Sequence, residues 1–370
     1  MIIIWFCFLT LFLYAFLILK YTFGWHALRS VSNQNFSPKV SVIIAIRNEE
    51  DKIVPLINHL SLQIYDKDKL EFILVDDHSN DNTLNLLKQY ATENMKVINM
   101  PDGNFGKKDA ISIAVSNSNG EVIIATDADC TFSPNWVSTM AGCFADPKVK
   151  LVSGPVMFSK KNKGIFHSLQ ALEFSSLIAT GAGSIATKNA IFCNGANMAY
   201  RKSVFLDLNN FKNDSLASGD DVFLLHNIKK EYPTSLSFIK EHNAIVTTNT
   251  AKNFSSFINQ RKRWTAKSVK YKDLTSIYVA YLVLFTNLSL FILSLFLFLD
   301  ISFYRLFMIF FIIKFIVDLL LLYPTLIFFN RKDLIKWIFP FEFLYSIYVI
   351  LIVPVSFITE FDWKGRQYKK

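Results

Sequence analysis

Residues 122–129 read VIIATDAD, an uncharged run of five residues followed by two carboxylates that flank an alanine. Three comparable runs precede it: VSVIIAI at 40–46, FILVDD at 72–77 and VINM at 97–100. Short apolar runs of this kind are typical of parallel strands that are buried on both faces. Helical stretches separate the runs, so the alternation predicts βαβ units and a mostly parallel sheet with helices on both faces. The expected fold class is α/β.

Long blocks with little charge flank this α/β region. Residues 2–19 and 277–299 carry no charge, and residues 303–329 and 337–359 carry few charged side chains. A helix needs about 20 apolar residues to cross a bilayer. The sequence therefore predicts transmembrane helices in addition to the α/β domain, which explains why 52% of the 370 residues are hydrophobic.

The predicted organisation divides the chain at the ends of these blocks. In chain order we expect a transmembrane anchor at 1–20, a juxtamembrane linker at 21–37, an α/β catalytic domain at 38–275, transmembrane helices at 276–300 and 302–329, a transmembrane or re-entrant helix at 337–359 and a basic cytoplasmic tail at 360–370. The helix at 337–359 could either cross the membrane or re-enter it. A full crossing would put the basic tail outside, against the tendency of Lys and Arg to stay in the cytoplasm.

The charge balance favours a membrane partner over nucleic acid. The formal net charge is +9, and basic proteins commonly bind either nucleic acid or anionic membranes. Membrane blocks in the same chain favour the second, so we expect no nucleic-acid partner. Lys20, His26 and Arg29 follow the first block, so the positive-inside rule predicts an outward N-terminus. The expected location is the inner (cytoplasmic) membrane, in a multi-pass topology with the α/β domain in the cytoplasm.

The four cysteines point to neither zinc nor disulfides. Cys7, Cys130, Cys143 and Cys193 contain no CxxC pair, and no histidine lies at zinc-finger spacing. We expect them to be buried thiols.

Carboxylates follow two of the predicted strands. In open α/β sheets, ligands bind at the carboxyl ends of strands. Asp127 and Asp129 are two residues apart, so on an extended segment their side chains would point to one side. Two oxygens so placed suit Mg²⁺ or Mn²⁺ shared with phosphate oxygens. The structural alternatives are a helix cap for Asp76-Asp77-His78-Ser79 and a solvated turn for Asp127-Ala128-Asp129.

Two more polar motifs lie further along the chain. Gly219-Asp220-Asp221 precedes a predicted helix, where acids can compensate the helix dipole or one can act as a general base. Gln260-Arg261-Lys262-Arg263-Trp264 lies on a helical stretch. Its structural alternative is an amphipathic helix on anionic lipid. In the functional interpretation, Arg263 binds a diphosphate through its planar fork and Trp264 stacks on a sugar.

The helical stretch around the last motif also has a predicted apolar face. Helical spacing would bring four side chains to that face: Phe254, Phe257, Ile258 and Trp264.

The order and spacing of these motifs resemble family 2 glycosyltransferases with the GT-A fold, in the membrane-anchored subgroup with a QxxRW motif. The resemblance covers roughly residues 38–275 and the flanking helices. Further matching segments are SVIIAIRNE at 41–49, GKKDA at 106–110, NGANMAYR at 194–201 and WKGRQY at 363–368. The last is similar to the WxGRxY ending of several lipid-directed members. The chain resembles lipid glycosyltransferases of the ceramide glucosyltransferase type and, less closely, processive polysaccharide synthases.

The resemblance implies a role for each motif. The nucleotide would be held by Asp76, Asp77, Arg47, Glu49 and Lys107. A divalent cation, Mn²⁺ or Mg²⁺, would be held by Asp127 and Asp129. Asp221 would be the general base, with Asp220 as the alternative. The diphosphate and the acceptor would be served by Gln260, Arg263, Trp264, Asn194 and Gly195.

The implied activity is inverting transfer of a sugar from a nucleotide diphosphate sugar, with UDP as the default, in cell-envelope glycan or glycolipid synthesis. The acceptor would be a membrane lipid or a lipid-linked glycan. The first alternative is a processive synthase of the cellulose or hyaluronan type, which needs a polymer channel. The membrane blocks offer few polar side chains for one, namely Arg305, Lys314, Asp318 and Glu342. A catalytically inactive membrane scaffold is the remote alternative, and the motif acids argue against it.

Overall fold

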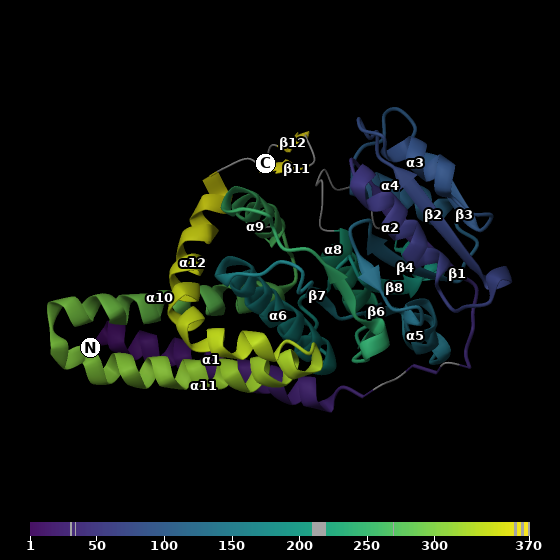
Figure 1. Ribbon diagram of the computed structural model, residues 1–370. Coiled ribbons are helices and arrows are strands. Elements are labelled where there is room, and N and C mark those ends of the chain that lie inside the picture. Colours follow the sequence, from purple (N-terminus) through teal and green to yellow (C-terminus); the bar gives the residue numbers. More distant parts are fainter. Residues whose placement is uncertain are drawn as a thin grey trace. The chain divides into compact units, whose positions relative to one another are not determined.

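The computed structural model describes residues 1–29, 32–33, 35–208, 220–268, 270–358, 361–363 and 366–368 (Figure 1). Its contacts divide the chain into two compact units. The sheet unit comprises Leu28–Ser159 and Ala190–Asn249. The helical unit comprises Met1–Ala27, Lys160–Asn189 and Thr250–Lys370. Two stretches within the predicted α/β domain, 160–189 and 250–275, thus group with the apolar helices.

The sheet unit is built on a seven-stranded sheet with the order β3-β2-β1-β4-β8-β6-β9. Its strands are β1 Val40–Ile46, β2 Leu70–Asp76, β3 Met95–Asn99, β4 Val122–Asp127, β6 Leu151–Ser153, β8 Met198–Arg201 and β9 Leu236–Phe238. Strands β1 to β4 are parallel to one another, and β8 is antiparallel to both β4 and β6. The predicted α/β class and mostly parallel sheet are confirmed, and all four predicted apolar runs contribute strands.

Helices alternate with the strands along this part of the chain. They are α2 Glu50–Ser61, α3 Thr83–Tyr90, α4 Lys107–Ser116, α5 Trp136–Gly142, α7 Lys202–Asp207 and α8 Asp220–Glu231. In α2, for example, Ile53, Leu56, Ile57 and Leu60 recur at helical spacing and are buried. A second, three-stranded sheet has the order β5-β10-β7, with β5 Thr131–Phe132, β7 Val156–Phe158 and β10 Val246–Thr248.

Within the described residues, the helical unit contains six α-helices, two short 3-10 helices (Ile301–Phe303 and Lys332–Trp337) and a terminal hairpin. The α-helices are α1 Ile2–Ala27, α6 Ile165–Ala186, α9 Phe254–Ser268, α10 Leu274–Leu299, α11 Tyr304–Phe328 and α12 Ile338–Ile358. The hairpin pairs β11 Phe361–Trp363 with β12 Arg366–Tyr368, in the segment that contains the WKGRQY tail. Helix α1 continues seven residues past the predicted end of the anchor at residue 20.

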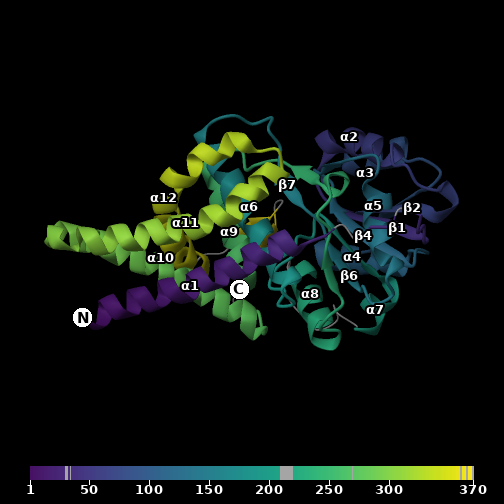
Figure 2. The same cartoon turned by 90° about the horizontal axis from the view of Figure 1, so that it is seen from below.

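Four helical segments are long and apolar enough to cross a membrane: Ile2–Ala27, Leu274–Leu297, Ile301–Phe328 and Lys332–Pro354. Helices α1, α10 and α11 run lengthwise beside one another in Figure 1, and the view from below in Figure 2 shows the same grouping. Helix α12 crosses them steeply in Figure 1. Both interpretations of this last block, a crossing or a re-entrant helix, therefore stay open.

Two glycines bring α1 and α6 into close contact. A Cβ on Gly24 would lie 2.6 Å from the carbonyl oxygen of Gly183, and a Cβ on Gly183 would lie 2.5 Å from that of Tyr21. Both distances are too short for any side chain, so the two backbones approach more closely than larger residues would permit. Small residues at such crossings are usual where apolar helices pack tightly.

A buried cluster of charges joins α1, α11 and α12. The Lys314 ammonium is fully buried, lies 2.9 Å from Asp318 Oδ2 and also pairs with Glu342. The Tyr14 hydroxyl donates to Asp318 Oδ1 at 2.6 Å. Three of the four polar side chains noted in the C-terminal blocks thus bind one another, whereas Arg305 is exposed. Ionisable side chains in apolar helices require such partners.

We expect Lys314→Met to destabilise the protein by about 3 kcal/mol or more, because it leaves two carboxylates buried without their cation. Thermal unfolding in detergent, followed by loss of the monodisperse protein, measures the effect. Lys332→Met is the matched control, since Lys332 is exposed. Equal unfolding temperatures for the two variants would contradict the stabilising role of the cluster.

Candidate functional site

The register of the parallel strands brings three motifs to one edge of the sheet. Ile46 at the end of β1 is paired with Asp76 at the end of β2. On its other side, β1 pairs Ala45 with Asp127 at the end of β4. The residues that follow β1 and β2, including Arg47 and Asp77, therefore emerge at the edge where the DxD motif begins. The carboxylates that were expected at strand ends do lie at the ends of β2 and β4.

Asp76 and Arg47 shape the turn after β2. Asp76 is buried and accepts hydrogen bonds from the Ser79 backbone N–H at 3.1 Å and the Ser79 hydroxyl at 2.5 Å. These contacts close a turn and are not the helix cap of the structural alternative, because α3 begins only at Thr83 and its N-cap is Asn82. The Arg47 guanidinium is also buried, and its Nη1 donates to the carbonyl oxygens of Asp77 and His78, both at 2.6 Å. These bonds hold His78 in a left-handed conformation with φ 51°.

The start of α4 joins the two acidic motifs. Asp77 Oδ2 accepts a hydrogen bond from the Gly106 backbone N–H at 3.1 Å. Gly106 has φ 90°, which a residue with a side chain rarely adopts, and it caps α4. The next residue, Lys107, places its Nζ 2.6 Å from Asp127 Oδ1. Two consecutive residues of the GKK segment therefore contact the Asp77 and Asp127 carboxylates.

Glu49 lies at a neighbouring helix start. It is the residue before α2, it is partly buried, and its backbone N–H donates to the Thr83 hydroxyl at 2.8 Å. This bond ties the loop after β1 to the start of α3.

The DxD motif differs in one respect from the prediction. Strand β4 ends at Asp127, and Asp129 lies in the turn that follows, so the two carboxylates do not share an extended segment. Asp129 Oδ2 accepts a hydrogen bond from the Thr248 hydroxyl of β10 at 2.9 Å. The turn gives each carboxylate its own partner, Lys107 for Asp127 and Thr248 for Asp129. Both carboxyl-bearing residues remain partly accessible.

The thiol next to this motif is inert. Burial raises the pKa of Cys130 well above its usual value, and the negative charges of Asp129 and Asp127 add to the effect. Cys130 is therefore a protonated thiol at neutral pH and does not supply a thiolate ligand. All four cysteines are buried and free, as predicted.

Asp221 is held beside the glycine-led segment that precedes β8. Its Oδ2 accepts a hydrogen bond from the Gly195 backbone N–H at 2.9 Å, and a Cβ on Gly195 would lie 3.3 Å from that oxygen. The Asn194 side chain accepts from the Ala196 N–H at 2.9 Å. Thr126, just before Asp127, donates to the Ala196 carbonyl oxygen at 2.8 Å. A short series of hydrogen bonds thus connects the end of β4 with Asp221. Gly219 and the Asp220 side chain lie outside what the structure describes.

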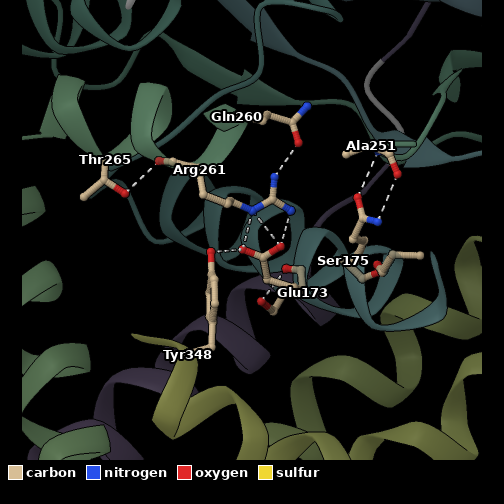
Figure 3. A network of polar contacts seen from close by, with 10 residues as sticks. Glu173, Ser175, Ala251, Gln260, Arg261, Thr265 and Tyr348 are labelled. Atoms are coloured by element: carbon tan, nitrogen blue, oxygen red, sulfur yellow. Dashed lines mark hydrogen bonds and ion pairs between the residues drawn. The ribbon is translucent and has the colours of Figure 1, made fainter. Parts of the chain in front are cut away.

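The QRKRW motif lies on α9 in the helical unit, and Figure 3 shows its surroundings. Gln260, Arg263 and Trp264 are partly buried, whereas Arg261 is only 2% exposed. Arg261 forms an ion pair with Glu173 of α6. The predicted apolar face is wrong at Phe254, which is 68% exposed.

The buried face of α9 has a different composition from the one predicted. Phe257 and Arg261 are buried and Trp264 is partly buried beside them, with the Arg261 guanidinium stacked on both rings at 4.6 and 4.3 Å from their centroids. An arginine takes the place expected for an apolar residue because Glu173 neutralises its charge. The sequence contained one signal of this pair, since Glu173 is the only charged residue in the helical run GIFHSLQALEFSSLIA. Nothing in the sequence indicated that Tyr348 would bind Glu173 or that Thr248 would bind Asp129.

Comparison with known proteins identifies the domain. Residues 41–208 match the model for "Glycosyl transferase family 2". The glycosyltransferase AglE of Haloferax volcanii is 27% identical over 217 residues, which are 56% of this chain and 66% of AglE. The hyaluronan synthase of Streptococcus pyogenes is 22% identical over 246 residues, 63% of this chain and 57% of the synthase. The chain thus spans less than two thirds of either relative.

A solved structure supports the fold over nearly the whole chain. The mannosyltransferase PcManGT of Pyrobaculum calidifontis, determined in complex with GDP-Man and Mn²⁺, superposes with a TM-score of 0.60. The match covers 95% of this chain and 96% of that structure at 18% identity, so it establishes a shared fold. Residues 41–208 thus contain a family 2 glycosyltransferase domain, the shared fold is GT-A, and the chain also has helices apolar enough to cross a membrane.

Proposed function

We propose that this chain is an inverting glycosyltransferase that moves a sugar from a nucleotide diphosphate sugar, in the first place a UDP-sugar, to a lipid acceptor in the membrane. The contact of α4 with both acidic motifs carries the proposal. Gly106 binds Asp77 and Lys107 binds Asp127, so one helix start links a predicted nucleotide residue with a predicted metal ligand. The donor sugar of the mannosyltransferase, GDP-Man, makes a GDP-sugar the second donor to test.

The donor would be bound at its nucleoside and at its diphosphate. Asp77, fixed by Gly106, would accept hydrogen bonds from the base or ribose, and the Arg47 and Asp76 contacts hold the loop around it. A helix start offers backbone N–H groups and a positive dipole end to phosphate oxygens. Lys107 adds a full positive charge there. The diphosphate would therefore lie between the start of α4 and the end of β4.

A divalent cation fits the DxD region. Asp127 and Asp129 are hard oxygen donors, and Asp127 already binds the positive charge of Lys107. Among the described residues no group of three His, Cys, Asp or Glu side chains could hold a metal ion. The remaining ligands would then be phosphate oxygens of the donor, as is usual for Mg²⁺ sites. When bound, the cation would offset the negative charge that develops on the leaving diphosphate.

Asp221 would be the general base. Its carboxylate is oriented by two backbone groups: the Gly195 N–H donates to Oδ2 and the Val222 N–H donates to Oδ1. Asp221 would take the proton of the acceptor hydroxyl as that oxygen attacks the anomeric carbon. The bond from this carbon to the diphosphate oxygen breaks, and the nucleoside diphosphate leaves. A single displacement inverts the anomeric centre and needs one base.

The helical unit would supply the acceptor side. Gln260, Arg263 and Trp264 are proposed to serve the diphosphate and the acceptor, and the apolar helices of the same unit would keep a lipid within reach. Lys314, Asp318 and Glu342 bind one another, so these side chains are not available to line a water-filled channel. This contact favours a single addition to a lipid. The similarity to hyaluronan synthase keeps a processive polysaccharide synthase as the second candidate.

The first experiment is a transfer assay with purified protein in nanodiscs, a panel of UDP- and GDP-sugars, Mn²⁺ or Mg²⁺, and native membrane lipids. We expect one donor to be consumed in a lipid-dependent reaction that adds one sugar to a lipid, as read by mass spectrometry. A ladder of products from a single lipid would establish the processive alternative. No transfer from any donor would overturn the proposal.

Asp221→Asn should lower the turnover number by about a hundredfold or more, because the amide cannot accept the acceptor proton. Binding of the nucleoside diphosphate should change little. Glu231→Gln is the matched control, since it removes one carboxylate from the exposed end of the same helix. Full turnover in Asp221→Asn would remove Asp221 from the mechanism.

Chelation of divalent cations should abolish transfer, and Mn²⁺ or Mg²⁺ should restore it. Asp129→Asn should raise the cation concentration required for half-maximal rate by about tenfold or more, because a charged ligand is lost. Thr248→Val should raise it less, since the carboxylate stays but loses its hydrogen bond from β10. Unchanged cation dependence in Asp129→Asn would contradict the assignment; Glu231→Gln again serves as the control.

A further inference from the structure

We propose that Arg261 is a positioning residue that orients Gln260 and Trp264 for sugar transfer, and that Glu173 is its counter-ion. The inference rests on the proposed function, because these two side chains matter only if α9 serves the donor or the acceptor. It assigns a role to the second residue of QRKRW, which the motif leaves unspecified. All the contacts that carry it lie within the helical unit.

Arg261 is fixed to α6 by a two-pronged ion pair. Its Nε lies 2.9 and 3.0 Å from the two carboxylate oxygens of Glu173, and its Nη2 bonds the second oxygen. The Tyr348 hydroxyl of α12 donates to Glu173 Oε1 at 3.1 Å (Figure 3). Both charged side chains are almost fully buried, 2% and 5% exposed. A planar guanidinium held this way cannot rotate without losing several bonds.

The same guanidinium contacts two residues of the motif. Its remaining nitrogen, Nη1, donates to Gln260 Oε1 at 2.6 Å, as Figure 3 shows. Its flat face lies 4.3 Å from the Trp264 ring centroid, and that ring also packs near Phe174, with centroids 6.0 Å apart. One edge of Arg261 therefore binds α6, another binds Gln260, and the face supports Trp264. The Gln260 amide nitrogen is left to point away from Arg261.

This arrangement separates the two arginines of the motif. Arg261 is committed to Glu173 and is buried, so it does not serve as a phosphate ligand. Arg263 is partly buried and is the proposed diphosphate residue. Holding catalytic side chains rigidly lowers the cost of reaching the reactive geometry, and a displacement of about 1 Å can cost about a hundredfold in rate. A helix tied by Arg261 to α6 meets this requirement.

Arg261→Lys tests the inference because it keeps the charge opposite Glu173. One ammonium cannot form the two-pronged pair and also bind Gln260 and stack on Trp264. We expect the turnover number to fall at least about tenfold, with the KM for the donor changed less than about threefold because Asp77 and its neighbours are untouched. Lys262→Met, one residue along the same helix, is the control and should retain the wild-type turnover number and donor KM.

A double-mutant cycle with Gln260→Ala distinguishes positioning from general support. Because Arg261 acts in part through Gln260 and in part through Trp264, the double variant should lose less rate than the product of the two single losses. If the loss of turnover number in the double variant equals the product of the two single losses, the proposal is overturned. A wild-type turnover number in Arg261→Lys also overturns it. If that variant does not fold, Arg261→Gln combined with Glu173→Gln removes both charges together, and the same kinetic criteria apply.

Hydrogen exchange separates failure of this inference from failure of the proposed function. Peptides covering residues 254–265 should exchange faster in Arg261→Lys than in wild type or Lys262→Met. This readout requires no substrate. If the wild-type protein transfers no sugar, the proposed function fails and exchange alone decides whether Arg261 holds α9. Unchanged exchange, or faster exchange with an undiminished turnover number, overturns the positioning role.

Discussion

The parallel pairing of β1 with both β2 and β4 determines where the chemistry can occur. Because β1 lies between these strands, the register that pairs Ile46 with Asp76 also brings Ala45 opposite Asp127. A shift of one residue would turn the buried side chains of a strand to its other face, so the apolar runs fix the register as well as the core. The acidic motifs therefore meet at one edge as a consequence of strand packing, and the start of α4 fills the space between them with a backbone N–H and a lysine.

The helical unit obeys a different constraint, which is that its charges must find partners inside apolar surroundings. Lys314 meets Asp318 and Glu342, and Arg261 meets Glu173. Helix α12 contributes to both groups, through Glu342 and Tyr348. A buried pair of this kind is weak evidence for stability, because desolvation offsets much of the attraction. Such a pair does specify geometry, because a buried charge is costly unless all of its partners are in place. Both clusters therefore restrict how the helices can pack.

The sequence predicted what depends on local patterns. Apolar runs such as VSVIIAI located the strands, the uncharged blocks located the helices, and acids at strand ends located the edge of the sheet. It did not predict that Asp129 would bind Thr248, because 119 residues separate the two and β10 is only three residues long. The face of α9 was mistaken for a related reason. From the sequence, Arg261 would be placed on the surface, because its partner Glu173 lies 88 residues away.

The path of the chain couples the two kinds of constraint. The backbone passes between the units four times, after Ala27, Ser159, Asn189 and Asn249. Two of these passages leave directly from the three-stranded sheet, since Ser159 follows β7 and Asn249 follows β10. Thr248, which binds Asp129, is thus joined by a short segment to α9, and β7 is joined in the same way to α6, which carries Glu173. The paired strands β7 and β10 lead to the paired residues Glu173 and Arg261. Within the sheet unit, a register change between β7 and β10 would displace Thr248 and so break its hydrogen bond to the DxD motif.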